Sequence, residues 1–357
     1  MSEFYNVKKA LQIFGSALSA QDLESQVGRS LPPFSKSADG RKLKSWSNDE
    51  LILVGEQIGF LKKPSQPKAV SIFVTKGGVL KTALTLNLAR MAALHNIKTC
   101  VIGLDMQSDI TEILGGAQVA GEDDSLEDAL TKVNQVKGLA QVFDGSEKIE
   151  NILCSTDLNC LKFISETPEL VALDQSLINK NRREYWLKEN VVDVLKKDFD
   201  LILMDCSPNW NRLITNALIA SDLLVSPVEC KINNFRNLKI FRALVAEFKA
   251  EMQKNLEHIF LPTKYSPTRK LSSEIFKWYT ANLPRCIQGA IKESITGEEA
   301  CALHLSVPEF QGTSEAATEM RLILQKIFEN FSLEKATHID SAIGMSSKIK
   351  ESNVAWT

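Results

Sequence analysis

The residues with the clearest capacity for chemistry form one run, Thr75-Lys76-Gly77-Gly78-Val79-Leu80-Lys81-Thr82. This run follows an apolar, strand-like stretch (69–75) and precedes a helix-like one (83–95). Glycines let a backbone wrap closely around a phosphate, and the amides that open a helix direct partial positive charge at the same point. Lys81 can then reach the terminal phosphates, and the Thr82 hydroxyl can bind Mg²⁺. Simple turns use similar patterns, but the flanking strand and helix favour a phosphate-binding loop.

Two aspartates end apolar runs further along the chain. Asp105 follows Ile102-Gly103-Leu104, and Asp205 follows 201–204. In an open parallel sheet the carboxyl ends of the strands share one edge, where ligands bind. Carboxylates there can orient Mg²⁺, largely through its waters, and can position a nucleophilic water. The alternative is that each aspartate only caps the following helix; a phosphate loop at the same edge favours the metal site.

The elements that must position these groups alternate between strands and helices from Ala69 onward. Strand-like apolar runs follow the first one, separated by helix-like segments, at 98–104, 201–205, 223–228, 258–262 and 286–291. Buried apolar strands with helices between them indicate an α/β fold whose mostly parallel sheet is flanked by helices. No tandem repeat or low-complexity tract interrupts this pattern.

The first 65 residues have a different texture. Helices are predicted at Val7–Leu18 and Ala20–Val27, and Ser47 has the position of a cap for a third helix. The run 62–68 contains two prolines and is typical of a linker. The predicted organisation is a small helical domain (1–65), a main domain (66–335) and a C-terminal tail (336–357).

Composition limits the class of protein. With 357 residues the chain has room for two domains, and 44% hydrophobic residues exclude a disordered chain. No apolar run approaches the roughly 18 residues of a membrane helix, and the start lacks the pattern of a secretory signal. The cysteines number seven, with no CxxC pair, which predicts free thiols in a reducing cytoplasm and argues against zinc.

The charge is distributed unevenly. A formal charge of −2 argues against a uniformly basic DNA-coating protein. Residues 1–69 nevertheless hold ten basic and seven acidic residues, and 264–292 hold six basic and one acidic, whereas 105–150 hold three basic and eleven acidic. Each segment is either ordinary solvated surface or, for the basic ones, a DNA-binding surface. Trp278 and Tyr279 are expected in the core rather than stacked on bases.

The loop, with a second lysine ahead of its glycines, resembles the deviant Walker A motif of the ParA/MinD ATPases. Among these, the length before the loop is most similar to the longer plasmid-type ParA proteins, which have an N-terminal winged-helix region. The resemblance covers roughly 69–330 and implies a P-loop NTPase fold with ATP and Mg²⁺ as cofactors. It continues through Asp105 and Gln107, 205–208, 216–222, 260–263 and 295–300.

The resemblance also implies roles. Lys76 corresponds to the signature lysine that crosses to the partner subunit's nucleotide in an ATP-bound dimer, and Asp105 to the residue that positions water. Asp205 corresponds to the Walker B aspartate, followed by a switch region at 206–211. The implied catalytic residues are Lys76, Lys81 and Asp105; the nucleotide-binding residues are Lys76, Gly77, Gly78, Val79, Leu80, Lys81, Thr82, Ala83, Pro262 and Thr263; and the magnesium ligands are Thr82, Asp105 and Asp205.

Four positions depart from the family pattern. Leu80 stands where the family often has glycine, and Gly103 replaces a common first aspartate. Met106 and Ser207 each replace a proline. These changes bear on the rate of hydrolysis more than on the fold.

The implied function is ATP-driven DNA segregation, of a plasmid or a chromosome, by a cytoplasmic, nucleoid-associated prokaryotic ATPase. Such a protein forms an ATP-dependent homodimer, binds DNA non-specifically and possesses a ParB-like adaptor that stimulates hydrolysis; an operator is a further DNA partner. No membrane partner is expected. Two alternatives stay open, a nucleotide-switched regulator or autorepressor with little turnover, and the positioning of a protein cargo on the nucleoid. The candidate DNA contacts are Arg41, Lys42 and Lys44 on a wing, and Lys264, Arg269, Lys270, Lys277 and Arg285.

Overall fold

The centre of the molecule is one eight-stranded sheet, seen in a computed structural model that describes residues 4–36, 43–107, 109–115, 125 and 136–331. The strands are β3 (Lys68–Ile72), β4 (Thr99–Leu104), β5 (Leu153–Ser155), β6 (Leu161–Ile164), β7 (Leu201–Cys206), β8 (Leu223–Glu229), β9 (Glu257–Tyr265) and β10 (Ile291–Lys292). Their order is β10-β9-β8-β3-β7-β4-β6-β5, and every neighbouring pair is parallel except the edge pair β5–β6. The predicted α/β fold with a mostly parallel sheet is confirmed.

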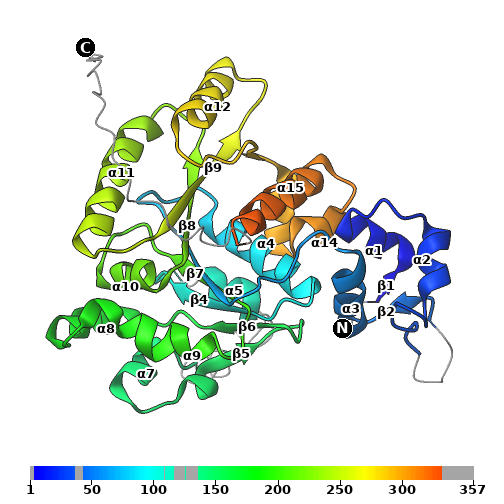
Figure 1. Cartoon of the computed structure of the whole chain (residues 1–357), viewed down its shortest axis with the longest axis horizontal. Coiled ribbons are helices and arrows are strands. Elements are labelled where there is room, and N and C mark those ends of the chain that lie inside the picture. The colour runs from blue at the N-terminus through cyan, green and yellow to red at the C-terminus, as the bar shows by residue number, and fades with distance from the viewer. Residues whose placement is uncertain (1–3, 37–42, 108, 116–124, 126–135, 332–357) are drawn as a thin grey trace, which may run out of the picture.

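Helices cover both faces of this sheet (Figure 1). Alternate side chains of β3 point to opposite faces, so Val70 and Ile72 enter one core while Ala69 and Phe73 enter the other. One core includes α4 (Lys81–Leu94), α13 (Ile295–Ala302), α14 (Val307–Gln311) and α15 (Glu315–Glu329); the other includes α8 (Leu170–Ser176), α10 (Arg212–Ala220), α11 (Asn234–Glu251) and α12 (Lys270–Asn282). Burial on both faces explains why the strands are apolar throughout.

One predicted strand was wrong. The run 286–291 forms only an isolated bridge between Cys286 and Phe260, and the regular pairing resumes at β10. The segment lies at the sheet edge and contains Gly289, which has no side chain to pack there. The short strands β5 and β6 were not predicted.

The N-terminal unit (residues 4–36 and 43–60) consists of three helices and a two-stranded ribbon. The helices are α1 (Val7–Phe14), α2 (Ala20–Gln26) and α3 (Asn48–Ile58), and β1 (Tyr5–Asn6) pairs antiparallel with β2 (Ser45–Trp46). Helix α1 is shorter than predicted because Gly15 ends it in the left-handed conformation, with φ of 60°. The predicted Ser47 cap is confirmed, with Glu50 completing a capping box.

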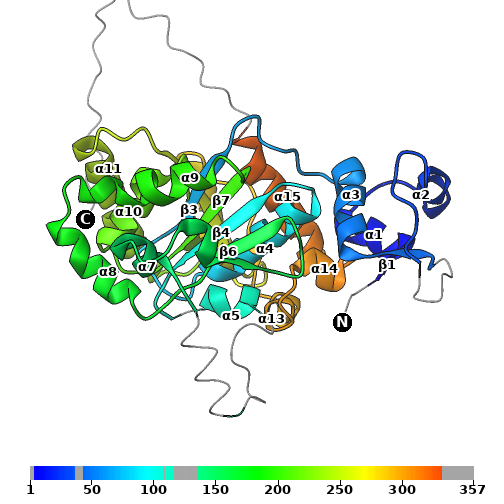
Figure 2. The same cartoon turned by 90° about the horizontal axis from the view of Figure 1, so that it is seen from below.

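This unit shares a core with the main domain, and Figure 2 shows α1 and α3 beside α14 and α15. The rings of Phe14 and Phe60 both meet the ring of His95, at the end of α4, edge-on. The His95 Nε2 accepts a hydrogen bond from the Phe60 N–H at 3.0 Å, so the ring is neutral with its proton on Nδ1. Burial lowers the pKa of His95 to about 4. A Cβ on Gly55 would lie 1.9 Å from the Leu94 carbonyl oxygen, so only glycine permits this approach of α3 to α4.

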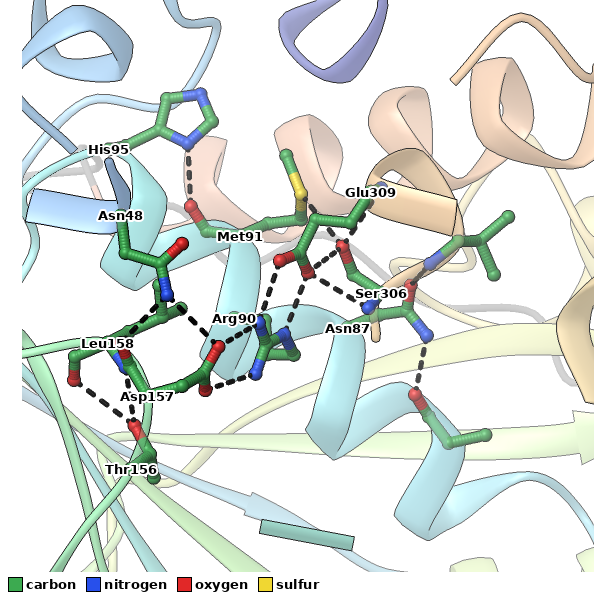
Figure 3. A network of polar contacts seen from close by, with 12 residues as sticks. Asn48, Asn87, Arg90, Met91, His95, Thr156, Asp157, Leu158, Ser306 and Glu309 are labelled. Carbon is green, nitrogen blue, oxygen red and sulfur yellow. Dashed lines mark hydrogen bonds and ion pairs between the residues drawn. The ribbon is translucent and has the colours of Figure 1, made fainter. Parts of the chain in front are cut away.

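A buried polar network ties the middle of α4 to its neighbours (Figure 3). Arg90 is 3% exposed and donates to both carboxylate oxygens of Glu309, in α14, at 2.8 Å each. It also binds Asp157, between β5 and β6, at 2.8 and 2.9 Å, and Asn48 of α3 donates to the Asp157 carbonyl at 2.9 Å. Removing one member of a buried ion pair leaves an uncompensated charge, so α4 is firmly held at this point.

Some predictions fall outside the described residues. They are the tail 336–357 and the wing residues Arg41 and Lys42. Within the described part of the chain, no helix is long and apolar enough to cross a membrane. All seven cysteines are free thiols.

Candidate nucleotide site

The predicted phosphate loop connects β3 to α4. Gly77 and Gly78 face open space, since a Cβ on either would meet no atom within 4 Å. Gly78 has a φ of 67°, which glycine adopts at no steric cost. Helix α4 begins at Lys81, so its first amides point into this hollow. The loop therefore has the shape that an anion requires.

Leu80 occupies a position that glycine would suit better. Its φ is 72°, in the left-handed region, and it is the residue that immediately precedes α4. A residue with a Cβ pays about 1–2 kcal/mol for this conformation. The Leu80 carbonyl oxygen nevertheless accepts the first hydrogen bond of the helix, from the Leu84 amide at 3.0 Å. The leucine at this position, where the family often has glycine, therefore strains the backbone of the loop.

Replacing Leu80 by glycine is expected to stabilise the free protein by up to about 1 kcal/mol. The left-handed penalty of about 1–2 kcal/mol disappears, and it exceeds the roughly 0.5–1 kcal/mol that glycine adds through the unfolded chain. Urea unfolding followed by tryptophan fluorescence measures the change. Leu80→Ala is the control, because it removes the same side chain and keeps the penalty. If both variants were equally stable, the positive φ would carry no cost.

The two lysines of the loop point to different partners. Lys81 is 7% exposed, and its Nζ donates to the Lys76 carbonyl oxygen at 3.2 Å, so it lies within the loop. The Lys76 Nζ lies 2.5 Å from Oε2 of Glu229, at the end of β8. Glu229 also pairs with Lys231 at 3.0 Å. Burial raises the pKa of Glu229, but these two cations lower it more, so this pKa lies below its usual range.

Thr82 and Asp205, both predicted magnesium ligands, are brought together. Asp205 is 1% exposed and accepts hydrogen bonds from Thr82 Oγ1 at 2.8 Å and from Thr85 Oγ1 at 3.0 Å. Burial raises the pKa of Asp205 to about 6, against the effect of these hydroxyls. Thr85 was not predicted; its spacing of three from Thr82 on a helix was the available signal.

Asp105 lies apart from this pair. Its Oδ1 accepts from the Gln107 amide at 3.3 Å, and within the described residues no hydrogen bond joins it to Thr82 or Asp205. Its own amide donates to Oε1 of Glu166 at 3.3 Å. Glu166 is 3% exposed, and burial followed by the charge of Asp205 raises its pKa to about 8. Sequence reasoning missed Glu166 because β6, which it follows, was itself missed.

A cavity of about 660 Å³ adjoins the loop. Leu80 and Ala83 line it on one side, and Lys264 with the segment 291–295 lines it on another. Its volume is within the range of small-ligand sites. Pro262 and Thr263, predicted to hold adenine, are not among its lining residues. Thr263 is fully buried, and its Oγ1 has no hydrogen-bond partner in the described part of the chain.

The candidate DNA contacts of 264–292 do not form one surface. Lys264 lies at the carboxyl end of β9, and Arg269, Lys270 and Lys277 lie at the start of α12 and along it. Lys270 is 3.9 Å from Glu274. Arg285 instead pairs with Glu257, at the opposite end of β9. Lys264 lies seven residues beyond Glu257 along the strand, a distance of about 23 Å. Tyr279 is fully buried, so the expectation that it belongs to the core is confirmed.

A protein-family model described as an AAA domain matches residues 67–258, which is more than half of the chain. The chain belongs to this family. The chromosome-partitioning ATPase Soj of Treponema pallidum is 28% identical over 212 residues, covering 58% of this chain and 76% of Soj. The ParA-type resemblance of this P-loop chain is thereby confirmed.

Two solved structures share the fold of this ParA-type chain. A plasmid partition protein from Borrelia burgdorferi, bound to AMPPNP, has a TM-score of 0.59 and 20% identity, covering 74% of this chain and all of that one. Cobyrinic acid a,c-diamide synthase from Mycobacterium smegmatis, with ADP and magnesium, has a TM-score of 0.60 and 19% identity, covering 74% of this chain and 96% of that one.

Proposed function

We propose that the chain is a ParA-type ATPase that binds ATP with Mg²⁺, dimerises on it, and couples slow hydrolysis to the segregation of a DNA cargo. One observation carries this proposal. Two lysines flank the glycines of one loop, and the Thr82–Asp205 pair lies at the same sheet edge. The family and the partitioning relative support it.

The residues present fit ATP and magnesium. Mg²⁺ prefers oxygen ligands and is held by one or two carboxylates together with substrate phosphates. Thr82 and Asp205 offer such oxygens, and among the described residues no cluster of three or more His, Cys, Asp or Glu could hold a metal without a ligand's help. When bound, the metal would neutralise charge that develops on the phosphates. Thr82 and Asp205 would hold it.

Each remaining residue then has a task. Lys81 and the amides of 77–82 bind the phosphates of the same subunit. Asp105 orients the attacking water from the end of β4. Lys76 leaves Glu229 and reaches the partner subunit's nucleotide, so the ion pair with Glu229 belongs to the monomer.

DNA would bind to the ATP dimer through the basic cluster formed by Lys264, Arg269, Lys270 and Lys277. Lys264 ends β9, and the exposed Arg269, Lys270 and Lys277 lie at the start of α12 and along it, where they can contact phosphates. The N-terminal unit would add a second, winged-helix-like DNA contact, because a ribbon and three helices bring the exposed Lys44 beside β2. A nucleoid-bound, cytoplasmic protein with a ParB-like adaptor follows from the same proposal.

The test is the binding of a labelled random-sequence duplex, measured by fluorescence anisotropy with ATP, ADP or no nucleotide. Tight binding is expected with ATP only, falling steeply between about 50 and 200 mM salt. Lys277→Ala should weaken DNA binding and lower the slope of log affinity against log salt concentration by about 1. Lys148→Ala, on another surface, should change neither. Equal affinity in all three nucleotide states would refute the proposal. ATP-dependent binding without turnover would favour the alternative of a nucleotide-switched regulator.

A further inference from the structure

Gly103 and Glu166 share one space at the catalytic edge of the sheet. A Cβ on Gly103 would lie 2.1 Å from Cγ of Glu166 and 2.9 Å from its Oε1. Gly103, in β4, is in register with Asp205 of β7, and Ile102 with Ile164 of β6. The Glu166 side chain therefore leaves the end of β6 and crosses β4 where a residue with a side chain would block it.

Both carboxyl oxygens of Glu166 accept hydrogen bonds from the segment that carries Asp105. Its Oε1 accepts from the Asp105 amide at 3.3 Å, and its Oε2 accepts from the Thr111 amide at 3.2 Å and from the Thr111 hydroxyl at 3.3 Å. The Thr111 Oγ1 in turn accepts from the Glu166 amide at 2.7 Å. The carboxylate thus joins the residue after β4 to α5 (Asp109–Gly115).

This arrangement is costly for a purely structural contact. Glu166 is 3% exposed, and among the described residues it forms no ion pair. A buried carboxyl group without a cation is costly to ionise, and even in its neutral form its burial is unfavourable unless its hydrogen bonds are needed. An apolar side chain would fill the same space, but it would leave the Asp105 and Thr111 amides without an acceptor.

We propose that Glu166 is a positioning residue, which fixes the backbone of Asp105 so that this carboxylate is aimed at the attacking water. Gly103 is also needed for this role, because a side chain at position 103 would occupy the space through which the Glu166 side chain passes. The inference rests on the proposed ATPase function. Glu166 touches neither the phosphate loop nor Thr82, so it acts on the chemistry through Asp105. A displacement of about 1 Å at such a group can cost 100-fold in rate.

The experiment compares Glu166→Ala and the isosteric Glu166→Gln with the exposed Glu169→Gln as the matched control. Steady-state turnover gives kcat, and fluorescent ATP binding gives Kd. For Glu166→Ala we expect kcat to fall at least about tenfold, while Kd changes by less than about threefold. In an Asp105→Ala background the same change should lower kcat no further, because both act on one step.

A relocated carboxylate provides the rescue. Gly103→Asp alone should collide with Glu166, but in the Glu166→Ala protein it should restore part of kcat by supplying a carboxylate in the same space. Wild-type kcat in both Glu166 variants, or an undiminished effect in the Asp105→Ala background, would overturn the inference.

Hydrogen exchange provides a readout that needs no turnover. The Asp105 and Thr111 amides should exchange faster in Glu166→Ala and unchanged in Glu169→Gln; unchanged exchange in Glu166→Ala would refute the inference. If the wild-type protein bound ATP without hydrolysing it, the proposed function would fail, and this measurement would still decide whether Glu166 holds Asp105.

Discussion

Lys76→Ala is expected to lower ATP turnover by at least about 100-fold, as does the loss of other groups that stabilise transition-state charge. ATP should still bind to the monomer, because Lys81 and the loop amides remain. In the free chain the Lys76 ammonium pairs with Glu229, at the end of β8. The loss should therefore appear in kcat and in ATP-dependent dimerisation, and not in Kd.

Analytical ultracentrifugation with ATP, beside nucleotide binding and turnover, checks this expectation. Lys81→Ala should instead abolish binding, and Lys98→Ala, at an exposed position far along the chain from the loop, should behave as wild type. Glu229→Gln provides the converse, since it weakens the contact that retains Lys76 and should favour the dimer. A Lys76→Ala protein that still dimerised on ATP and turned it over would exclude a role across the interface.

Asp205→Asn is expected to abolish turnover and, at the same time, to stabilise the nucleotide-free protein. Burial raises the pKa of Asp205 to about 6, above its unfolded value near 3.8. Above pH 6 the folded chain must hold this carboxyl ionised, so its contribution opposes folding. Asparagine removes the charge and still pairs with the Thr82 and Thr85 hydroxyls. At pH 8 the gain should be on the order of 1–3 kcal/mol.

The sign of the pH dependence makes this prediction specific. As the pH falls from 6 towards 4, the wild-type carboxyl takes up its proton in the folded state, so the advantage of Asp205→Asn should disappear. Urea unfolding without nucleotide at pH 8 and pH 4.5 measures the difference between the two proteins. Asp198→Asn, at an exposed position, is the control and should show no such change. A destabilised Asp205→Asn protein at pH 8 would contradict the assigned cost of burial.

The parts of the site that lie on one segment could be predicted, and those that depend on strand order could not. Lys81 and Thr82 follow from a loop between a strand and a helix, and Asp105 and Asp205 from the ends of apolar runs. Glu166 and Glu229 reach the site only because β6 lies beside β4, and β8 beside β3. Neither adjacency is written in local spacing.

The basic residues provide the opposite lesson. Proximity along the chain grouped Arg285 with Lys264, but a nine-residue strand separates the ends at which their side chains act. Similarly, local pattern predicted the Ser47 cap of α3, whereas the contact of Gly55 with α4 depends on tertiary packing. Features that depend on a single turn or a single helix end could be predicted from the sequence.

Helix α4 connects the phosphate loop to the N-terminal unit. Its first turn faces the place for phosphates, and its last residues lie under the N-terminal unit, about 21 Å away for 14 residues. Arg90 joins the middle of this helix to Glu309 of α14, and close-packed protein interiors have low compressibility. One rigid helix therefore connects the phosphate loop to the N-terminal unit, and the packing of His95 against Phe14 and Phe60 fixes the position of one relative to the other.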